Sequence, residues 1–170
     1  MVAHANAPRG SLQHYFPGGK EQLVGEAVEW AGRYAARRVR RGAESMEDAT
    51  PGNLFAAMVQ PWRAEFADRG FGSGCPIVAT VADSAALSEK LRESAAAAFA
   101  EWRKPLVAEL EQMGVSATRA ASLAVLMISS LEGALVLARA DQDVAPLDAI
   151  VEELRPLLDG AVEKRRRRTG

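Results

Sequence analysis

Apolar residues recur every three to four positions along most of this chain, a spacing that fits helices rather than the strict alternation of half-buried strands. Ala and Leu are frequent, and β-branched residues are sparse outside short runs, which also favours helix. The pattern predicts an all-α bundle of about seven or eight helices without strands. The expected helices are a short one before Phe16, then residues 21–41, 54–68, 76–82, Ser84 or Ser88 to Met113, 116–139 and 146–164.

Residues suited to helix ends mark several of these boundaries. Thr50-Pro51-Gly52-Asn53 is a cap signal for the helix that follows, and Pro146 opens the last helix. Phe16-Pro17-Gly18-Gly19 stops the first short helix and starts another. Pro105 is expected to bend the long helix that contains it.

Charge is spread unevenly, although the whole chain has a net charge of −1. Residues 1–41 hold seven Lys or Arg against three acidic residues, and residues 163–170 hold five against one. The remaining residues, 42–162, hold 9 basic and 18 acidic side chains. A basic end on an acidic body is typical of a nucleic-acid-binding module joined to another module, and solvated helix faces are an equally weighted alternative.

Few residues suited to catalysis or metal binding are present. Two histidines, His4 and His14, and the single Cys75 cannot assemble a metal cluster or a nucleophile–base–acid set, so we expect no metal, no cofactor and no enzymatic activity. A single cysteine also fits a reducing cytoplasm. No secretory leader is visible, and the longest apolar run, residues 120–131, is shorter than the roughly 20 residues of a membrane span and continues into Glu132. A cytoplasmic protein outside the membrane is expected.

Residues 9–23, Arg-Gly-Ser-Leu-Gln-His-Tyr-Phe-Pro-Gly-Gly-Lys-Glu-Gln-Leu, suggest the second half of a helix-turn-helix. The second helix of that motif enters the major groove, where its polar side chains read base edges. Leu12 and Phe16 would anchor this helix, while Lys20 and the adjacent helix N-terminus would hold phosphate. The predicted DNA-binding residues are Pro8, Arg9, Gly10, Ser11, Gln13, His14, Tyr15 and Lys20.

The segment from Arg9 to Leu23 resembles the recognition helix and the following helix of the TetR/AcrR family of transcriptional regulators. Residues 74–77 and 130–139 resemble the ligand-binding domain of its LmrA/YxaF-type branch. This resemblance implies a TetR-like helical bundle that acts as a ligand-responsive repressor, as a homodimer on double-stranded operator DNA. It divides the chain into a partial helix-turn-helix with its connecting helix (1–41), a ligand-binding and dimerisation domain (42–164) and a basic tail (165–170).

Two departures from the family pattern matter. Gln13 stands where the family usually has Tyr, which removes an aromatic phosphate contact but leaves a group able to read adenine. The family also has two helices before the recognition helix, and only residues 1–5 could belong to the second of them. Without those helices each large apolar anchor loses contacts worth on the order of 1.5–3 kcal/mol, so tight operator binding is not expected of the chain as written.

The alternative function is therefore an N-terminally truncated TetR-like module that dimerises and binds ligand but does not hold DNA tightly. A mis-assigned start at an internal Met and a real truncation would both produce this N-terminus. Translation of the coding sequence upstream of Met1 distinguishes the two.

In the family, a pocket between the helices after the reader binds small, mostly apolar effectors. Met and aromatic residues at helical spacing would give it adaptable walls, although core packing is the more frequent fate of any one of them. Glu132 is the only charge between Leu123 and Ala138, and a buried carboxylate needs a partner, either a ligand or a dimer seam, unless it reaches solvent. The predicted pocket residues are Phe55, Met58, Val59, Trp62, Phe66, Cys75, Phe99, Trp102, Met127, Leu131 and Glu132.

Two apolar stripes on the last two expected helices predict dimerisation through a four-helix seam. The alternative is that both stripes only cover the core of one protomer. The predicted interface residues are Leu123, Ser130, Gly133, Ala134, Leu137, Leu147, Ile150, Leu154 and Leu157.

Overall fold

The structure, a computed structural model, describes residues 11–84 and 86–163, without the side chains of Ser11 and Leu12. Within these ranges every regular element is a helix, which confirms the all-α prediction. The helices are α1 (Ser11–Tyr15), α2 (Gly19–Glu44), α3 (Pro51–Arg69), α4 (Pro76–Ser84), α5 (Glu89–Gln112), α6 (Ala117–Asp141) and α7 (Ala145–Asp159).

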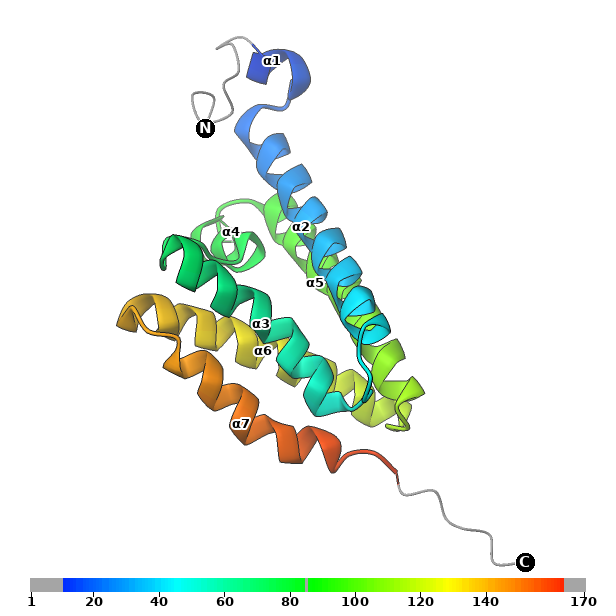
Figure 1. Ribbon diagram of the computed structural model, residues 1–170. Helices are drawn as coiled ribbons and strands as arrows, with labels where there is room; N and C mark the ends of the chain where they lie inside the picture. The colour runs from blue at the N-terminus through cyan, green and yellow to red at the C-terminus, as the bar shows by residue number, and fades with distance from the viewer. Residues whose placement is uncertain (1–10, 85, 164–170) are drawn as a thin grey trace, which may run out of the picture.

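The six longer helices form one bundle with a shared apolar core (Figure 1). The long helix α2 packs along α5, and α6 packs between α5 and α7. Helix α3 lies against α7, and the short α4 packs on α5 and α2. Helix α1 lies beyond the bundle, at the N-terminal end of α2. The fold therefore holds the predicted reader segment away from the core.

Two of the expected caps are confirmed, and they decide where the helices begin. Thr50 Oγ1 accepts a hydrogen bond from the backbone N–H of Asn53 at 3.2 Å. Ser88 Oγ accepts one from the N–H of Leu91 at 3.2 Å, so Ser88 rather than Ser84 is the cap of α5. Ser116 stands at the N-cap of α6, but its side chain makes no capping bond.

The last helix ends earlier than expected, at Asp159 rather than near Lys164. The chain turns at Gly160, and the N–H of Glu163 then donates to the carbonyl of Gly114 at 3.0 Å. Helix α2, in contrast, runs on to Glu44, so the division proposed at residue 41 lies inside it. Residues 164–170, expected to be a basic tail, lie outside the described residues.

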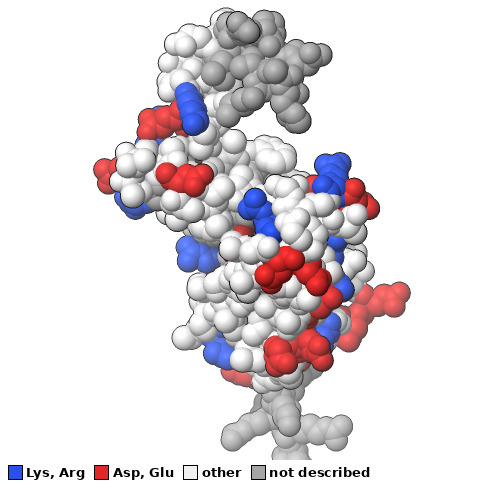
Figure 2. All heavy atoms as spheres, turned by 90° about the vertical axis from the view of Figure 1, so that its left-hand side faces the viewer, with Lys and Arg blue, Asp and Glu red and all other residues white. Residues whose placement is uncertain are grey.

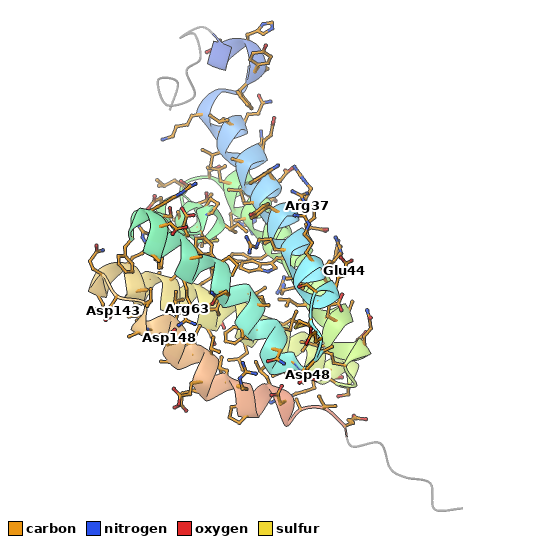
Figure 3. All side chains as sticks on the ribbon, in the orientation of Figure 1. Arg37, Glu44, Asp48, Arg63, Asp143 and Asp148 are labelled. Carbon is orange, nitrogen blue, oxygen red and sulfur yellow. The ribbon has the colours of Figure 1, made fainter. Side chains whose placement is uncertain are left out.

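Polar contacts fasten α3 to α7. Arg63 and Asp148 form an ion pair, and Figure 3 shows the two side chains pointing toward each other from these helices. At the N-terminus of α3, Asp159 Oδ1 accepts a hydrogen bond from the N–H of Gly52 at 2.7 Å. That carboxylate satisfies a backbone donor that the helix itself cannot bond.

Helix α6 is long and apolar enough, by length and composition, to cross a membrane. The apolar run expected from the sequence ends at Glu132, whereas the helix continues through this residue to Asp141. Half of its most apolar window is buried inside the protomer, as in the core helix of a bundle.

Close approach of α2 to α5 requires glycine at residue 32. A Cβ atom there would lie 2.7 Å from the Cα of Ala98, and the backbone of α5 cannot rotate out of the way. Gly32→Ala is therefore expected to lower the free energy of unfolding by about 1–2 kcal/mol, which is the cost of overpacking less the gain in helix propensity. Urea denaturation followed by far-UV circular dichroism measures the change.

Gly42→Ala is the matched control on the same helix, because its nearest contact would be the Cβ of Ala57 at 3.5 Å, an ordinary packing distance. This variant should be as stable as the parent or up to about 1 kcal/mol more stable. Equal losses in the two variants would contradict the close-approach argument.

Candidate functional site

The described part of the predicted DNA reader is exposed to solvent. Gln13, His14 and Tyr15 are exposed on α1, and 70% of Tyr15 is accessible. Lys20 is exposed in the first turn of α2. Ser11 belongs to α1, but its side chain lies outside the description, as do Pro8, Arg9 and Gly10. The described side chains are thus free to meet a partner.

A tight turn holds this segment at the end of α2. Gly19 has φ +70°, a backbone conformation that favours glycine, and its N–H donates to the carbonyl of Phe16 at 2.8 Å. The N–H of Gly18 donates to Gln22 Oε1 at 2.8 Å.

Helix α1 carries no Lys, Arg, Asp or Glu, whereas acidic side chains gather over the body of the bundle on the face seen in Figure 2.

A cavity of about 350 Å³ lies where α2, α3 and α4 meet, with single side chains from α5 and α6 at its inner wall. Its wall is mostly apolar, and all three tryptophans of the chain contribute to it. The residues that line it are Trp30, Ala31, Tyr34, Ala35, Arg38, Val39, Ala57, Met58, Pro61, Trp62, Glu65, Ser73, Gly74, Cys75, Pro76, Ile77, Trp102 and Leu131.

Five of the predicted pocket residues line this cavity, and the others lie elsewhere. The five are Met58, Trp62, Cys75, Trp102 and Leu131. Four others are packed in the core without lining it, namely Phe55, Val59, Phe66 and Met127. The remaining two, Phe99 and Glu132, line a second, more open hollow between α4, α5 and α6.

Sequence reasoning missed the contribution of α2 to the cavity. Trp30 and Tyr34 are stacked, with ring centroids 5.2 Å apart and 13° between the ring planes. The guanidinium of Arg38 lies 5.8 Å from the centre of the Tyr34 ring, and its Nη1 donates to the Tyr34 hydroxyl at 3.2 Å. Two large aromatic residues four positions apart, on a helix whose other exposed side chains are almost all charged, were the signal that could have found this wall.

The loop between α3 and α4 closes one side of the cavity and is tied down at two points. Ser73 Oγ donates to Glu65 Oε1 at 2.9 Å. Arg139 of α6 donates from Nε to the carbonyl of Phe71 at 3.2 Å, and its Nη1 would lie 2.9 Å from a Cβ at residue 74. Gly74 therefore allows the Arg139 side chain to lie directly against the loop.

The buried Glu132, which lines the second hollow, lies beside the partly buried Cys75, which lines the cavity. Burial raises the pKa of the Glu132 carboxyl from 4.5 to about 7, and a hydrogen bond from the Cys75 thiol offsets part of that rise. Oε1 of Glu132 has no hydrogen-bond partner among the described residues. Burial, and then the nearby Glu132 charge, raise the pKa of the Cys75 thiol to about 12, so this thiol stays protonated at neutral pH and is a weak nucleophile.

The outer face of α6 and α7 carries the exposed apolar side chains of Leu137 and Leu157, whereas Val125 of α6 lines the second hollow. Of the predicted interface residues, Gly133, Leu137 and Leu157 are exposed, and Ser130, Ile150 and Leu154 are partly buried. Leu123, Ala134 and Leu147 instead lie in the core of the bundle, because α6 packs between α5 and α7, and α7 packs against α3 and α6.

The chain is similar to known transcriptional regulators over nearly its whole length. Residues 51–153 match the C-terminal domain of LmrA/YxaF-like transcriptional regulators. An HTH-type transcriptional regulator of Mycobacterium tuberculosis is 36% identical over 172 residues, which cover 98% of this chain and 86% of that protein. The HTH-type transcriptional regulator LmrA of Bacillus subtilis is 31% identical over 148 residues, which cover 86% of this chain and 77% of LmrA.

Two solved structures share the fold. The TetR transcriptional regulator from Legionella pneumophila superposes with a TM-score of 0.78 at 20% identity, covering 92% of this chain and 83% of that one. The regulatory protein TetR from Rhodobacter sphaeroides superposes with a TM-score of 0.78 at 21% identity, covering 91% and 84%.

Proposed function

This chain belongs to the TetR family of transcriptional regulators, with an LmrA/YxaF-like C-terminal domain, and we propose that it is a repressor whose binding to DNA responds to a small, mostly apolar effector. The observation that carries the proposal is the aromatic cavity beside α2. The same helix bears Lys20 near its start and Trp30, Tyr34 and Arg38 in the cavity wall. One rigid element thus connects the effector site to the DNA reader.

In this proposal the residues around α1 divide into two roles. Pro8, Arg9, Gly10, Ser11, Gln13, His14 and Tyr15 present the reader to the major groove, and their polar side chains contact base edges. Lys20 contacts a phosphate, where a cation and the positive end of a long helix act together. The exposure of Gln13, His14 and Lys20 supports this assignment.

The two roles predict different responses to substitution. Gln13→Ala should change which base is preferred at one or two positions, since a bidentate contact discriminates by about 1–3 kcal/mol. Lys20→Ala should weaken binding to all sequences alike and lower the slope of log K against log salt by about one. Selection from random duplexes, followed by gel shifts on the gene's own promoter at several salt concentrations, measures both.

A uniform loss for both variants would contradict the base-reading role of Gln13. Failure of the parent chain to select any duplex would favour the alternative function, a module that dimerises and binds ligand without holding DNA tightly. Release of the promoter fragment by an effector that occupies the cavity is the expected sign of repression relieved by ligand.

We also propose that the regulator acts as a homodimer through the exposed apolar face of α6 and α7, which includes Gly133, Leu137 and Leu157. A four-helix seam of this kind buries apolar surface and fixes the spacing of two readers on DNA. Transcriptional regulation, and no enzymatic reaction, is the activity of the family to which it belongs. A cytoplasmic location follows from that role.

A further inference from the structure

We propose that the effector is a planar aromatic acid, a molecule of two or three fused or linked rings that carries one anionic group. This inference rests on the proposed ligand response, and it names the class of ligand that the cavity takes. The stacked aromatic pair on α2 favours a ligand with aromatic rings. Arg38, in the same wall, favours a ligand with an anionic group.

The aromatic wall is exposed in a way that core packing does not explain. Trp30 is 55% exposed and Tyr34 is 42% exposed, although both are large rings whose burial would be favourable. Their rings are nearly parallel and stack on each other, so each ring keeps at most one face for a ligand. Trp62 and Trp102 contribute further aromatic walls from α3 and α5. Flat walls of this kind favour a flat, unsaturated ligand, which stacks on them at little cost in conformational entropy.

The charge balance of the wall favours an anion. Two ionised side chains line the cavity, Arg38 and Glu65. Glu65 already has partners, since its Oε1 accepts from Ser73 at 2.9 Å and lies 3.7 Å from Arg69 Nη1. Arg38 makes no ion pair in the described part of the chain, and Tyr34 is the one side chain it contacts there through a hydrogen bond. Its planar guanidinium therefore retains donors for a carboxylate.

The size of the cavity limits the ligand. A volume of about 350 Å³ is near the lower end of the range for small-molecule sites. It accommodates a bicyclic or tricyclic acid with its rings between the tryptophans and its anionic group beside Arg38. A long flexible chain would leave the flat walls poorly filled.

Three probes of one shape test the charge. We expect the purified chain to bind 2-naphthoate about tenfold more tightly than the neutral 2-naphthamide, and naphthalen-2-ylmethanamine more weakly still, in calorimetric titrations at low salt. Arg38→Met should remove the preference for naphthoate over naphthamide, and Arg38→Lys should restore part of it. Trp30→Leu should weaken naphthoate and naphthamide alike, because it removes the stacking surface that both use.

Arg37→Met is the matched control, because Arg37 is the neighbouring exposed arginine on α2 and does not line the cavity. It should leave all three affinities unchanged. The three indole N–H signals in a nitrogen-15 correlation spectrum report the location, since every tryptophan of the chain lines this cavity. They should shift with naphthoate.

The outcomes distinguish the acid assignment from the presence of a ligand pocket. Equal affinity for naphthoate and naphthamide, or a preference that survives in Arg38→Met, would overturn the acid assignment and leave the pocket standing. Binding of none of the probes, with unshifted indole signals, would overturn the ligand pocket and this inference together.

Discussion

Glu132→Gln is expected to remove about 2–3 kcal/mol of pH dependence from the stability of this protein between pH 5 and pH 8. Burial raises the pKa of this carboxyl from 4.5 to about 7 in the folded chain, so the folded state holds the proton more tightly than the unfolded state. Between these two values the native state binds more protons, and stability therefore falls as the pH rises through this window. A glutamine cannot ionise and does not contribute to this fall.

The measurement is the free energy of unfolding in urea at a series of pH values, for parent and variant. The difference between pH 5 and pH 8 is the readout, because a constant offset from the new amide cancels in it. Glu153→Gln, at an exposed position of α7, leaves Glu132 in place and should keep the parental slope. A parental slope retained in Glu132→Gln would show that this carboxyl ionises freely in the folded protein. Arg103, which lines the same hollow, would then be the first neighbour to examine.

Leu137→Glu or Leu157→Glu is expected to weaken self-association by about a hundredfold or more. Both side chains are exposed on the outer face of α6 and α7, at 56% and 43%, so a charge there should hardly disturb the folded protomer. In a twofold-symmetric seam each substitution places two like charges at the interface, which costs several kcal/mol. Sedimentation equilibrium over a range of concentrations measures the change.

Leu87→Glu provides the control, because Leu87 is 88% exposed but lies in the connection before α5. It makes the same chemical change outside the proposed seam and should leave self-association unaltered. If all three variants behave like the parent, the pairing surface lies elsewhere.

Much of the fold could be predicted from local chemistry. Thr50 and Ser88 define the starts of α3 and α5 because their hydroxyls satisfy backbone donors within the next turn, an interaction that short sequence patterns encode. The end of α7 could not be predicted in this way. The hydrogen bond from Glu163 to Gly114 that accompanies it joins segments far apart in the chain, and no local pattern reports such a contact.

The cavity was only partly predictable for a related reason. Helical spacing identified the apolar residues of α3, but Phe55 and Val59 face the core while Met58 and Trp62 face the cavity. Which side of a wide apolar face borders an open space depends on how closely the neighbouring helix approaches. Tyr34 lies at helical spacing with the buried Ala31 and the partly buried Ala35 on α2, yet it is exposed and lines the cavity.

The close approach of Gly32 to Ala98 gives α2 a pivot point inside the bundle. Along the helix axis Arg38 lies about 9 Å to one side of that point and Lys20 about 18 Å to the other. A tilt of α2 about Gly32 would therefore move the end that carries Lys20 in the opposite direction to the end that carries Arg38, and about twice as far. A small displacement of α2 near Arg38 would thus become a larger displacement at the N-terminal end of the helix.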